Sequence, residues 1–126
     1  MPVSHVPRVL IVEDEPMIIF MLEDLLTEAG FEIACVATTL EAALSLIEAC
    51  GFDAAILDAN LAGVSSAPAA FALTTRAIPF LVVSGYSASQ QDVAYSGGLH
   101  VAKPFKPETL IEALRSILPA SKILRI

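Results

Sequence analysis

Three carboxylates follow two apolar segments of the sequence, and together they could hold a hard metal ion. Glu13 and Asp14 come directly after Arg8–Val12, and Asp58 ends the segment Ala54–Asp58. Ligand sites of open α/β sheets lie beyond the carboxyl ends of the strands, so these side chains would share one crevice. Two carboxylates roughly 5 Å apart repel by about 3 kcal/mol at an effective dielectric of about 20. Oxygen ligands without a neighbouring His or Cys pair favour Mg2+ as the compensating charge.

Two further polar residues stand at the ends of later apolar segments. Ser84 ends Pro79–Ser84, and Lys103 follows Leu99–Ala102. A lysine ammonium and a metal ion can neutralise phosphoryl oxygens, and a serine hydroxyl can donate a hydrogen bond to one of them. A carboxylate can act as the nucleophile. The set therefore predicts a site where a phosphoryl group is brought to Asp58.

The elements that would position these residues alternate along the chain. Short apolar runs predict strands, and apolar residues at helical spacing predict helices. Strict alternation implies a parallel sheet covered by helices on both faces, so we expect a doubly wound α/β domain. The second strand is followed only by Thr38 and Thr39, which fits a strand at the edge of the sheet, away from the site. The expected strands are Arg8–Val12, Ile33–Ala37, Ala54–Asp58, Pro79–Ser84 and Leu99–Ala102, and the expected helices begin at Pro16, Thr39 (as N-cap), Pro68, Ser87 and Pro107.

Composition bounds the class of protein. The chain has 126 residues, which suits one domain, and it is 56% hydrophobic with a mean hydropathy of +0.72. Its apolar runs are shorter than a membrane span requires, and residues 1–7 lack the features of a signal peptide, so we expect a soluble cytoplasmic protein. A net charge of -7 argues against binding nucleic acid through a basic patch.

Cys35 and Cys50 lack metal-ligand spacing, and we expect two buried, reduced thiols.

The ordered set Glu13-Asp14, Asp58, Ser84 and Lys103-Pro104 resembles the receiver domain of two-component response regulators, over nearly the whole chain. The resemblance implies a flavodoxin-like five-stranded sheet of order 2-1-3-4-5. It also implies a single receiver domain over residues 1–126, with an extension at 1–7 and a tail at 119–126. Such a protein accepts phosphate on Asp58 from a histidine kinase, and it is no enzyme beyond its own phosphorylation and dephosphorylation.

The resemblance also assigns roles to the other residues of the site. Asp14 would bind Mg2+ directly and Glu13 through water, with the backbone carbonyl of Asn60 completing the protein ligands. Lys103 would contact the phosphoryl group, and its peptide bond to Pro104 would be cis. Ser84 would be the switch hydroxyl that follows the phosphoryl group inward, while Asn60, Gly85 and Tyr86 would flank the phosphate.

Two departures from the family pattern affect the switch. His100 stands where receivers carry an aromatic residue, three positions before Lys103. It is either a half-exposed strand residue with one local hydrogen bond or a pH-sensitive gate over Ser84. The segment from Pro79 to Tyr86 partly resembles the motif of FATGUY receivers, which are mostly single-domain proteins. We expect a loosely held fourth helix after Gly85.

Two surfaces are candidates for partners. The first helix carries more apolar residues than one buried stripe needs, and in receivers this helix docks on the kinase; its candidates are Ile18, Ile19, Phe20 and Leu22. The fourth helix, fifth strand and fifth helix form the usual output and dimerisation face, which residues 122–126 could extend. No output domain is expected after the last helix, so the output would be protein–protein binding or phosphorelay.

Two other functions fit the same fold. A flavodoxin-like FMN or nucleotide-binding protein would cradle phosphate at the end of the first strand, but the acidic run Glu13-Asp14-Glu15 there repels phosphate unless a metal intervenes. A pseudo-receiver would keep the fold as an interaction module without being phosphorylated. The retained Asp58, Ser84 and Lys103 argue against the pseudo-receiver.

Overall fold

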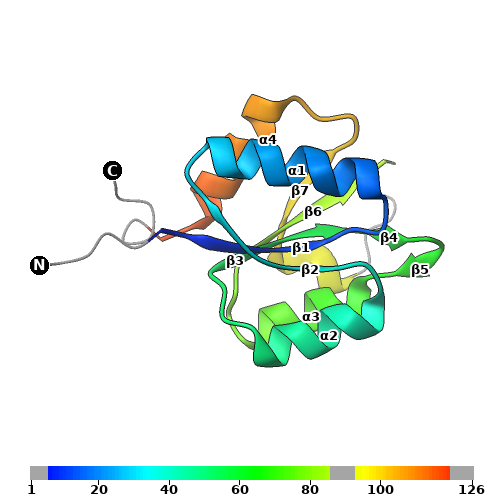
Figure 1. The fold of residues 1–126 in the computed structure, drawn as a ribbon. Coiled ribbons are helices and arrows are strands. Elements are labelled where there is room, and N and C mark those ends of the chain that lie inside the picture. The colour runs from blue at the N-terminus through cyan, green and yellow to red at the C-terminus, as the bar shows by residue number, and fades with distance from the viewer. Residues whose placement is uncertain (1–5, 86–92, 120–126) are drawn as a thin grey trace, which may run out of the picture.

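A parallel sheet forms the centre of the protein, as a computed structural model shows for residues 6–85 and 93–119 (Figure 1). Five strands lie in the order β2-β1-β3-β6-β7, and every neighbouring pair is parallel. This order is the predicted 2-1-3-4-5, with the second strand at an edge. The bounds agree with the predicted strands to within a residue: β1 is Arg8–Val12, β2 Glu32–Ala37, β3 Ala54–Asp58, β6 Phe80–Ser84 and β7 Leu99–Ala102.

Helices cover both faces of the sheet (Figure 1). The helices α1 (Pro16–Glu28) and α4 (Pro107–Ile117) lie on one face. The helices α2 (Leu40–Ala49) and α3 (Ala67–Thr75), with the 3-10 helix η2 (Val93–Gly97), lie on the other. The doubly wound α/β prediction is therefore confirmed.

Local sequence signals set the helix ends. Proline occupies the first turn of α1, where its missing N–H costs nothing, and Gly30 follows that helix with a positive φ of 96°. The hydroxyl of Thr39 accepts a hydrogen bond of 3.1 Å from the N–H of Ala42, which confirms the predicted N-cap of α2.

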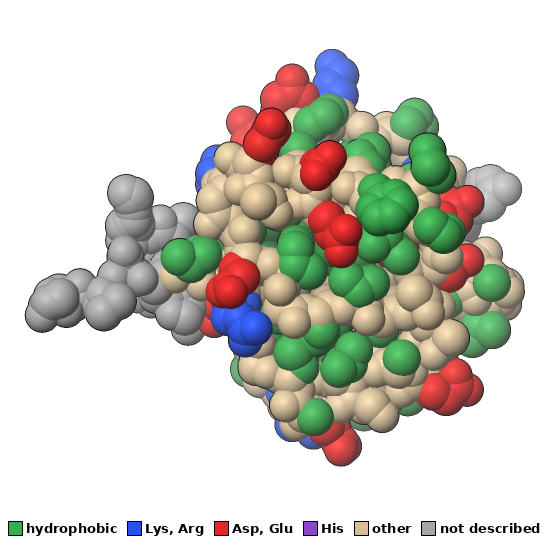
Figure 2. Space-filling model, viewed as in Figure 1, with side chains coloured by type: hydrophobic (Ala, Val, Ile, Leu, Met, Phe, Trp, Pro, Cys, Tyr) green, Lys and Arg blue, Asp and Glu red, His purple; other side chains and the backbone are tan. Residues whose placement is uncertain are grey.

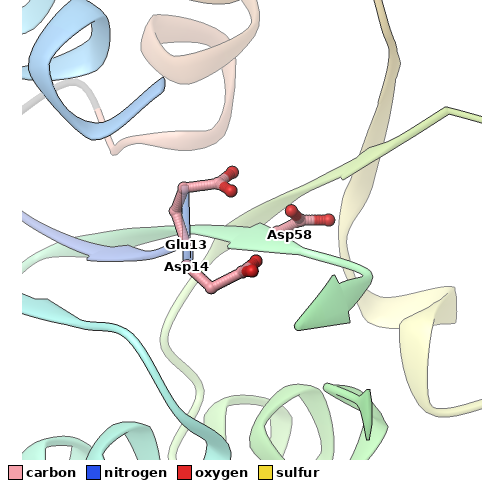
Figure 3. Close-up of side chains that lie close together, drawn as sticks. All are labelled: Glu13, Asp14 and Asp58. Atoms are coloured by element: carbon pink, nitrogen blue, oxygen red, sulfur yellow. The ribbon is translucent and has the colours of Figure 1, made fainter. Parts of the chain in front are cut away.

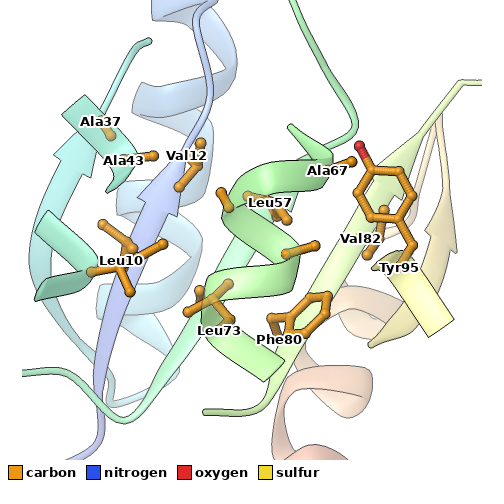
Figure 4. Packing of buried hydrophobic residues seen from close by; sticks show 14 of the residues in the cluster. Leu10, Val12, Ala37, Ala43, Leu57, Ala67, Leu73, Phe80, Val82 and Tyr95 are labelled. Carbon is orange, nitrogen blue, oxygen red and sulfur yellow. The ribbon is translucent and has the colours of Figure 1, made fainter. Parts of the chain in front are cut away.

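The two faces of the sheet are packed with side chains of different size. Alternate residues of each strand point to opposite faces, so Leu10 and Val12 join one cluster while Val9 and Ile11 join the other. The cluster under α1 and α4 is built mainly of Leu, Ile and Val. The cluster under α2 and α3 contains many alanines and two buried aromatic rings, Phe80 and Tyr95 (Figure 4).

A short hairpin follows β3 where the sequence predicted a loop. Its strands are β4 (Asn60–Leu61) and β5 (Val64–Ser65), paired antiparallel. The turn residues Ala62 and Gly63 both have positive φ, 52° and 92°, as a two-residue type I′ turn requires. Alanine is uncommon at such a position, so the sequence carried no clear signal for this turn.

The segment before β7 also differs from the prediction. A helix was predicted over Ser87–Tyr95, but residues 86–92 lie outside the described part of the chain. The described part of that segment is the 3-10 helix η2, which continues to Gly97. The predicted break at Gly97-Gly98 is confirmed, because β7 begins directly afterwards at Leu99.

The two cysteines are free, as predicted, but the expectation that they are buried was wrong. Both thiols are partly exposed, because Cys35 lies on the edge strand β2 and Cys50 ends α2. Burial, with the neighbouring Cys50 thiol, raises the pKa of Cys35 to about 12, which keeps this thiol protonated and unreactive.

Candidate functional site

The three predicted carboxylates meet at the carboxyl edge of the sheet. Glu13 and Asp14 continue from β1, Asp58 is the last residue of the adjacent strand β3, and the side chains point toward a common space (Figure 3). One carboxylate oxygen from each lies within 4.8 Å of the others. Glu13 and Asp58 are buried at 3% and 6% exposure, so the cluster is largely shielded from water.

Asp58 is held on both of its carboxylate oxygens. Oδ1 accepts a hydrogen bond of 3.0 Å from the backbone N–H of Asn60, and Oδ2 accepts one of 3.2 Å from Nζ of Lys103. The same Nζ lies 3.9 Å from Oε1 of Glu13. A single ammonium therefore serves two buried carboxylates, with Asp14 beside them.

The charges of the cluster shift two pKa values. Burial is the main reason that the pKa of Glu13 rises from 4.5 to about 7; Asp58 raises it further, while the hydrogen bond from the N–H of Glu15 and the charge of Lys103 lower it. Burial alone would lower the pKa of Lys103, but attraction to Asp58 and Glu13 outweighs it and the pKa rises. Lys103 stays charged, whereas Glu13 is only partly ionised near neutral pH.

This donor set fits a divalent cation of the Mg2+ type. Mg2+ prefers oxygen ligands, uses one or two carboxylates and keeps several waters. Burial and the charge of Asp58 both raise the pKa of Glu13, and a divalent ion bound among these carboxylates would supply positive charge that favours its ionised form. The acidic triad of Glu13, Asp14 and Asp58 is thus compatible with a Mg2+ site.

Ser84 and Lys103 come together at the ends of β6 and β7. The backbone N–H of Lys103 donates a hydrogen bond of 2.8 Å to the carbonyl of Ser84, and the peptide bond from Lys103 to Pro104 is cis, as predicted. The Ser84 side chain is partly buried and Gly85 is exposed. Tyr86 lies outside the described residues.

The positions of Asn60 and His100 are known from the structure, but these positions do not test the roles predicted for them. The Oδ1 atom of Asn60 accepts a hydrogen bond of 2.6 Å from the N–H of Gly63, which ties this side chain to the hairpin turn. His100 is exposed on β7, and its ring meets the ring of Tyr95 edge-on at 6.4 Å. Its strand partner is Val82, whereas Ser84 pairs with Ala102. The gate over Ser84 stays a prediction.

Of the four apolar candidates on the first helix, Phe20 is exposed, whereas the other three are partly or fully buried. Leu22 is 2% exposed and belongs to the core, and Ile18 packs against that core, because residues four apart share the inward face of α1. The exposed apolar side chains are Met17, Phe20 and Met21, at 77%, 65% and 40%. Figure 2 shows apolar side chains gathered with acidic ones over this part of the surface.

Sequence reasoning missed Tyr95. This residue of η2 is 3% exposed, and its hydroxyl reaches the segment that follows Asp58: it donates to the carbonyl of Ala59 at 3.1 Å and lies 3.0 Å from Oγ of Ser66. A signal was present, since a buried tyrosine hydroxyl needs partners and Tyr95 is the large side chain in a run of small ones.

Comparison with known proteins agrees with this geometry. The model of the response regulator receiver domain family matches residues 9–115. The sensory transduction protein RegX3 of Mycobacterium tuberculosis is 33% identical over 114 residues, which are 87% of this chain and 50% of RegX3. The chain thus spans about half the length of the curated relatives it matches.

Solved structures are similar over most of their length. The solution structure of SdrG from Sphingomonas melonis Fr1 is 39% identical, with a TM-score of 0.78, and the match covers 91% of this chain and 98% of SdrG. A CheY-like receiver domain protein from Methanospirillum hungatei JF-1 is 26% identical, with a TM-score of 0.78 and coverage of 88% and 92%. Together with the acidic triad at the carboxyl edge, these matches show that the chain belongs to the response regulator receiver domain family.

Proposed function

We propose that the protein is a single-domain response regulator, residues 1–126, whose Asp58 accepts a phosphoryl group from a histidine kinase in the presence of Mg2+. Receiver domains interact with histidine kinases, and they catalyse nothing beyond their own phosphorylation chemistry. The observation that carries the proposal is the contact of 3.2 Å between Lys103 and Asp58 inside the acidic cluster. In this contact the proposed acceptor lies beside an ammonium that can neutralise the incoming group.

The transfer is a substitution at phosphorus. A carboxylate oxygen of Asp58 forms the new P–O bond, the bond between phosphorus and the donor breaks, and its electron pair leaves with the donor. Lys103 neutralises a phosphoryl oxygen, and a bound Mg2+ would supply the remaining positive charge at Glu13, Asp14, Asp58 and the carbonyl of Asn60. Because Lys103 already touches Oδ2, it needs no large movement to contact a phosphoryl group on that oxygen.

The switch is proposed to run through Ser84. Its hydroxyl would donate to a phosphoryl oxygen and move toward Asp58, with the cis bond at Pro104 setting the position of Lys103. Gly85, Tyr86 and Asn60 would flank the phosphate. His100 would report the change at β7 in place of the usual aromatic residue.

Partner binding is proposed at two surfaces. The kinase would dock on the exposed face of α1, through Met17, Phe20 and Met21 rather than the buried Leu22. The face of β7, α4 and the segment before them would bind one of three partners: a downstream protein, a phosphotransfer protein or a second copy of this chain.

We propose that the protein works in the cytoplasm and belongs to the FATGUY type, which its partial motif from Pro79 to Tyr86 supports. No helix in the described part of the chain is long and apolar enough to cross a membrane.

Labelling with a small phosphodonor tests the function. The wild-type protein with Mg2+ should take up one phosphoryl group, seen as a mass increase of one phosphate, and Asp58→Asn should take up none. Asp53→Asn is the matched control, because Asp53 precedes the same strand at its other end. Equal labelling of wild type and Asp58→Asn would overturn the assignment. Absence of label on the wild type would instead favour the pseudo-receiver, and a bound flavin would favour the flavodoxin-like alternative.

A further inference from the structure

The hydroxyl of Tyr95 connects η2 to the acceptor loop, by which we mean residues 59–66 that follow Asp58. It lies 3.1 Å from the carbonyl oxygen of Ala59, 3.0 Å from Oγ of Ser66 and 3.4 Å from Oγ of Ser65. In Figure 4 the ring stands beside Val82 and its hydroxyl points toward the start of α3. One buried oxygen therefore touches both ends of the loop.

The direction of each hydrogen bond follows from the proton count. A carbonyl oxygen can only accept, so the single hydroxyl proton of Tyr95 goes to Ala59. The hydroxyl of Ser66 must then donate to the tyrosine oxygen. Ser66 is 0% exposed, so without Tyr95 its hydroxyl would lose this partner in a site that water does not reach.

The loop itself needs this support. The carbonyl of Ala59 also accepts a hydrogen bond of 3.2 Å from the N–H of Ser66, so a backbone hydrogen bond joins the two ends of the loop. The turn places Ala62 at a φ of 52°, a conformation that alanine disfavours. A strained turn persists when surrounding contacts define it, and Tyr95 provides such contacts from a different part of the chain.

The bond acts close to the phosphoryl site. Ala59 stands between Asp58 and Asn60, and its N–H donates a hydrogen bond of 3.0 Å to the carbonyl of Val83, the residue before Ser84. Asn60 in turn donates its N–H to Oδ1 of Asp58. A shift of the Ala59 carbonyl thus moves the backbone that orients the acceptor.

We propose that Tyr95 is a positioning residue for the acceptor loop. Its hydroxyl fixes the Ala59 carbonyl and Ser66, and so holds the backbone of Asn60 where a metal ion and Asp58 need it. The effect on metal binding and phosphoryl transfer rests on the proposed function, whereas the hold on the loop does not. Its ring is also part of the core, so the hydroxyl must be tested apart from the ring.

Tyr95→Phe makes that separation, because it keeps the ring and removes the oxygen. Ser116→Ala is the matched control: it removes another hydroxyl, one that donates a hydrogen bond of 2.7 Å to the carbonyl of Ala113 on the exposed side of α4. Amide hydrogen exchange of the metal-free protein should accelerate by about three- to tenfold at Asn60, Gly63 and Ser66 in Tyr95→Phe, the size expected for one lost hydrogen bond. Ser116→Ala should leave these amides unchanged.

A titration with Mg2+ reports the effect on the site. Followed by the amide shifts of Asp14 and Asn60, it should give a dissociation constant about three- to tenfold higher in Tyr95→Phe than in wild type and Ser116→Ala. Unchanged exchange of the loop amides in a folded Tyr95→Phe protein would overturn the proposal. Faster exchange with an unchanged Mg2+ constant would overturn the positioning role. If the wild type itself bound no Mg2+ and took no label, the proposed function would fail, and the exchange data would still decide whether Tyr95 holds the loop.

Discussion

Strand β3 has an aspartate at each end, and the two have opposite surroundings. Asp53, just before the strand, accepts a hydrogen bond of 2.8 Å from the N–H of Arg8 and donates its own N–H to the carbonyl of Arg8. Asp58, the last residue, lies with two more carboxylates and shares one lysine with Glu13. Asp53 joins two strands by hydrogen bonds, whereas Asp58 lies beside two carboxylates that repel it and one lysine that attracts it.

The same contrast extends across the sheet. At the amino end, Arg8 donates a hydrogen bond of 2.6 Å to the carbonyl of Gly51 and forms an exposed ion pair with Glu32, so opposite charges meet. At the carboxyl end, the burial of Glu13 raises its pKa to about 7, so its charge is disfavoured there. The amino end stabilises the fold, and the carboxyl end keeps an unfavourable charge arrangement that a cation and a phosphoryl group can use.

The largest effect is expected at the amino end, from Gly98→Ala. An added Cβ at Gly98 would lie 2.4 Å from the ring of Phe80 and 2.9 Å from its carbonyl oxygen, so backbone must move. Thermal or urea unfolding should show a loss of about 3 kcal/mol. Gly97→Ala is the control, since its Cβ would meet the flexible side chain of Thr74 at 2.8 Å and should cost less. Equal losses would show that the close approach to Phe80 is unimportant.

The next effect has the opposite sign and lies at the carboxyl end. Because the folded-state pKa of Glu13 is raised from 4.5 to about 7, the folded protein binds more protons than the unfolded chain between these values, and its stability falls as pH rises through about 7. Glu13→Gln should therefore stabilise the metal-free protein by about 2 kcal/mol at pH 8 and have little effect near pH 5. Urea unfolding at both pH values measures this.

Addition of Mg2+ provides the internal check on that variant. Bound cation stabilises the folded state by mass action, so the wild type should gain stability with Mg2+ and Glu13→Gln should gain less. A loss of stability in Glu13→Gln at pH 8 without metal would contradict the idea that the carboxyl end stores unfavourable charge.

A smaller loss is expected for Asp53→Ala. This change leaves the partly buried N–H of Arg8 without its acceptor of 2.8 Å, which should cost about 1 kcal/mol. The protein should still take up phosphate, because the change lies at the far end of β3 from Asp58. A gain in stability, or the loss of phosphate uptake in a folded variant, would show that the two ends are not separate in function.

The sequence was sufficient to place the carboxyl edge of the site. Parallel strands end at one edge, so the positions of Glu13, Asp58 and Lys103 after apolar runs already predicted that they meet. The order of the strands in the sheet came from the family resemblance, not from the strand ends, and the structure confirms it. The roles assigned to Ser84 and His100 were not tested by geometry, and they stay predictions.

What the sequence did not reveal depends on contacts between distant segments. The bond of Tyr95 to Ala59 joins residues far apart in the chain, and neither periodicity nor spacing marks it. The hairpin after Asp58 has Ala-Gly at its turn rather than the usual Asn-Gly, so local chemistry did not signal it. Helix α1 is apolar on several sides, which is why Leu22 was assigned to the surface although it is buried.

The smallest effect tests whether charge pairs at the two ends differ in strength. The pair of Arg8 and Glu32 is 3.4 Å long, and its side chains are 38% and 57% exposed, so solvent and salt screen it. Glu32→Gln should change the free energy of unfolding by less than about 0.5 kcal/mol, and that change should vanish in about 1 M salt.

The contact of Lys103 with Asp58 is shielded by burial. The change in the free energy of unfolding caused by Lys103→Met should therefore depend much less on salt, which unfolding at low and high salt measures. If both variants respond equally to salt, the carboxyl end is as open to solvent as the amino end, and burial could not be the main reason that the pKa of Glu13 is raised.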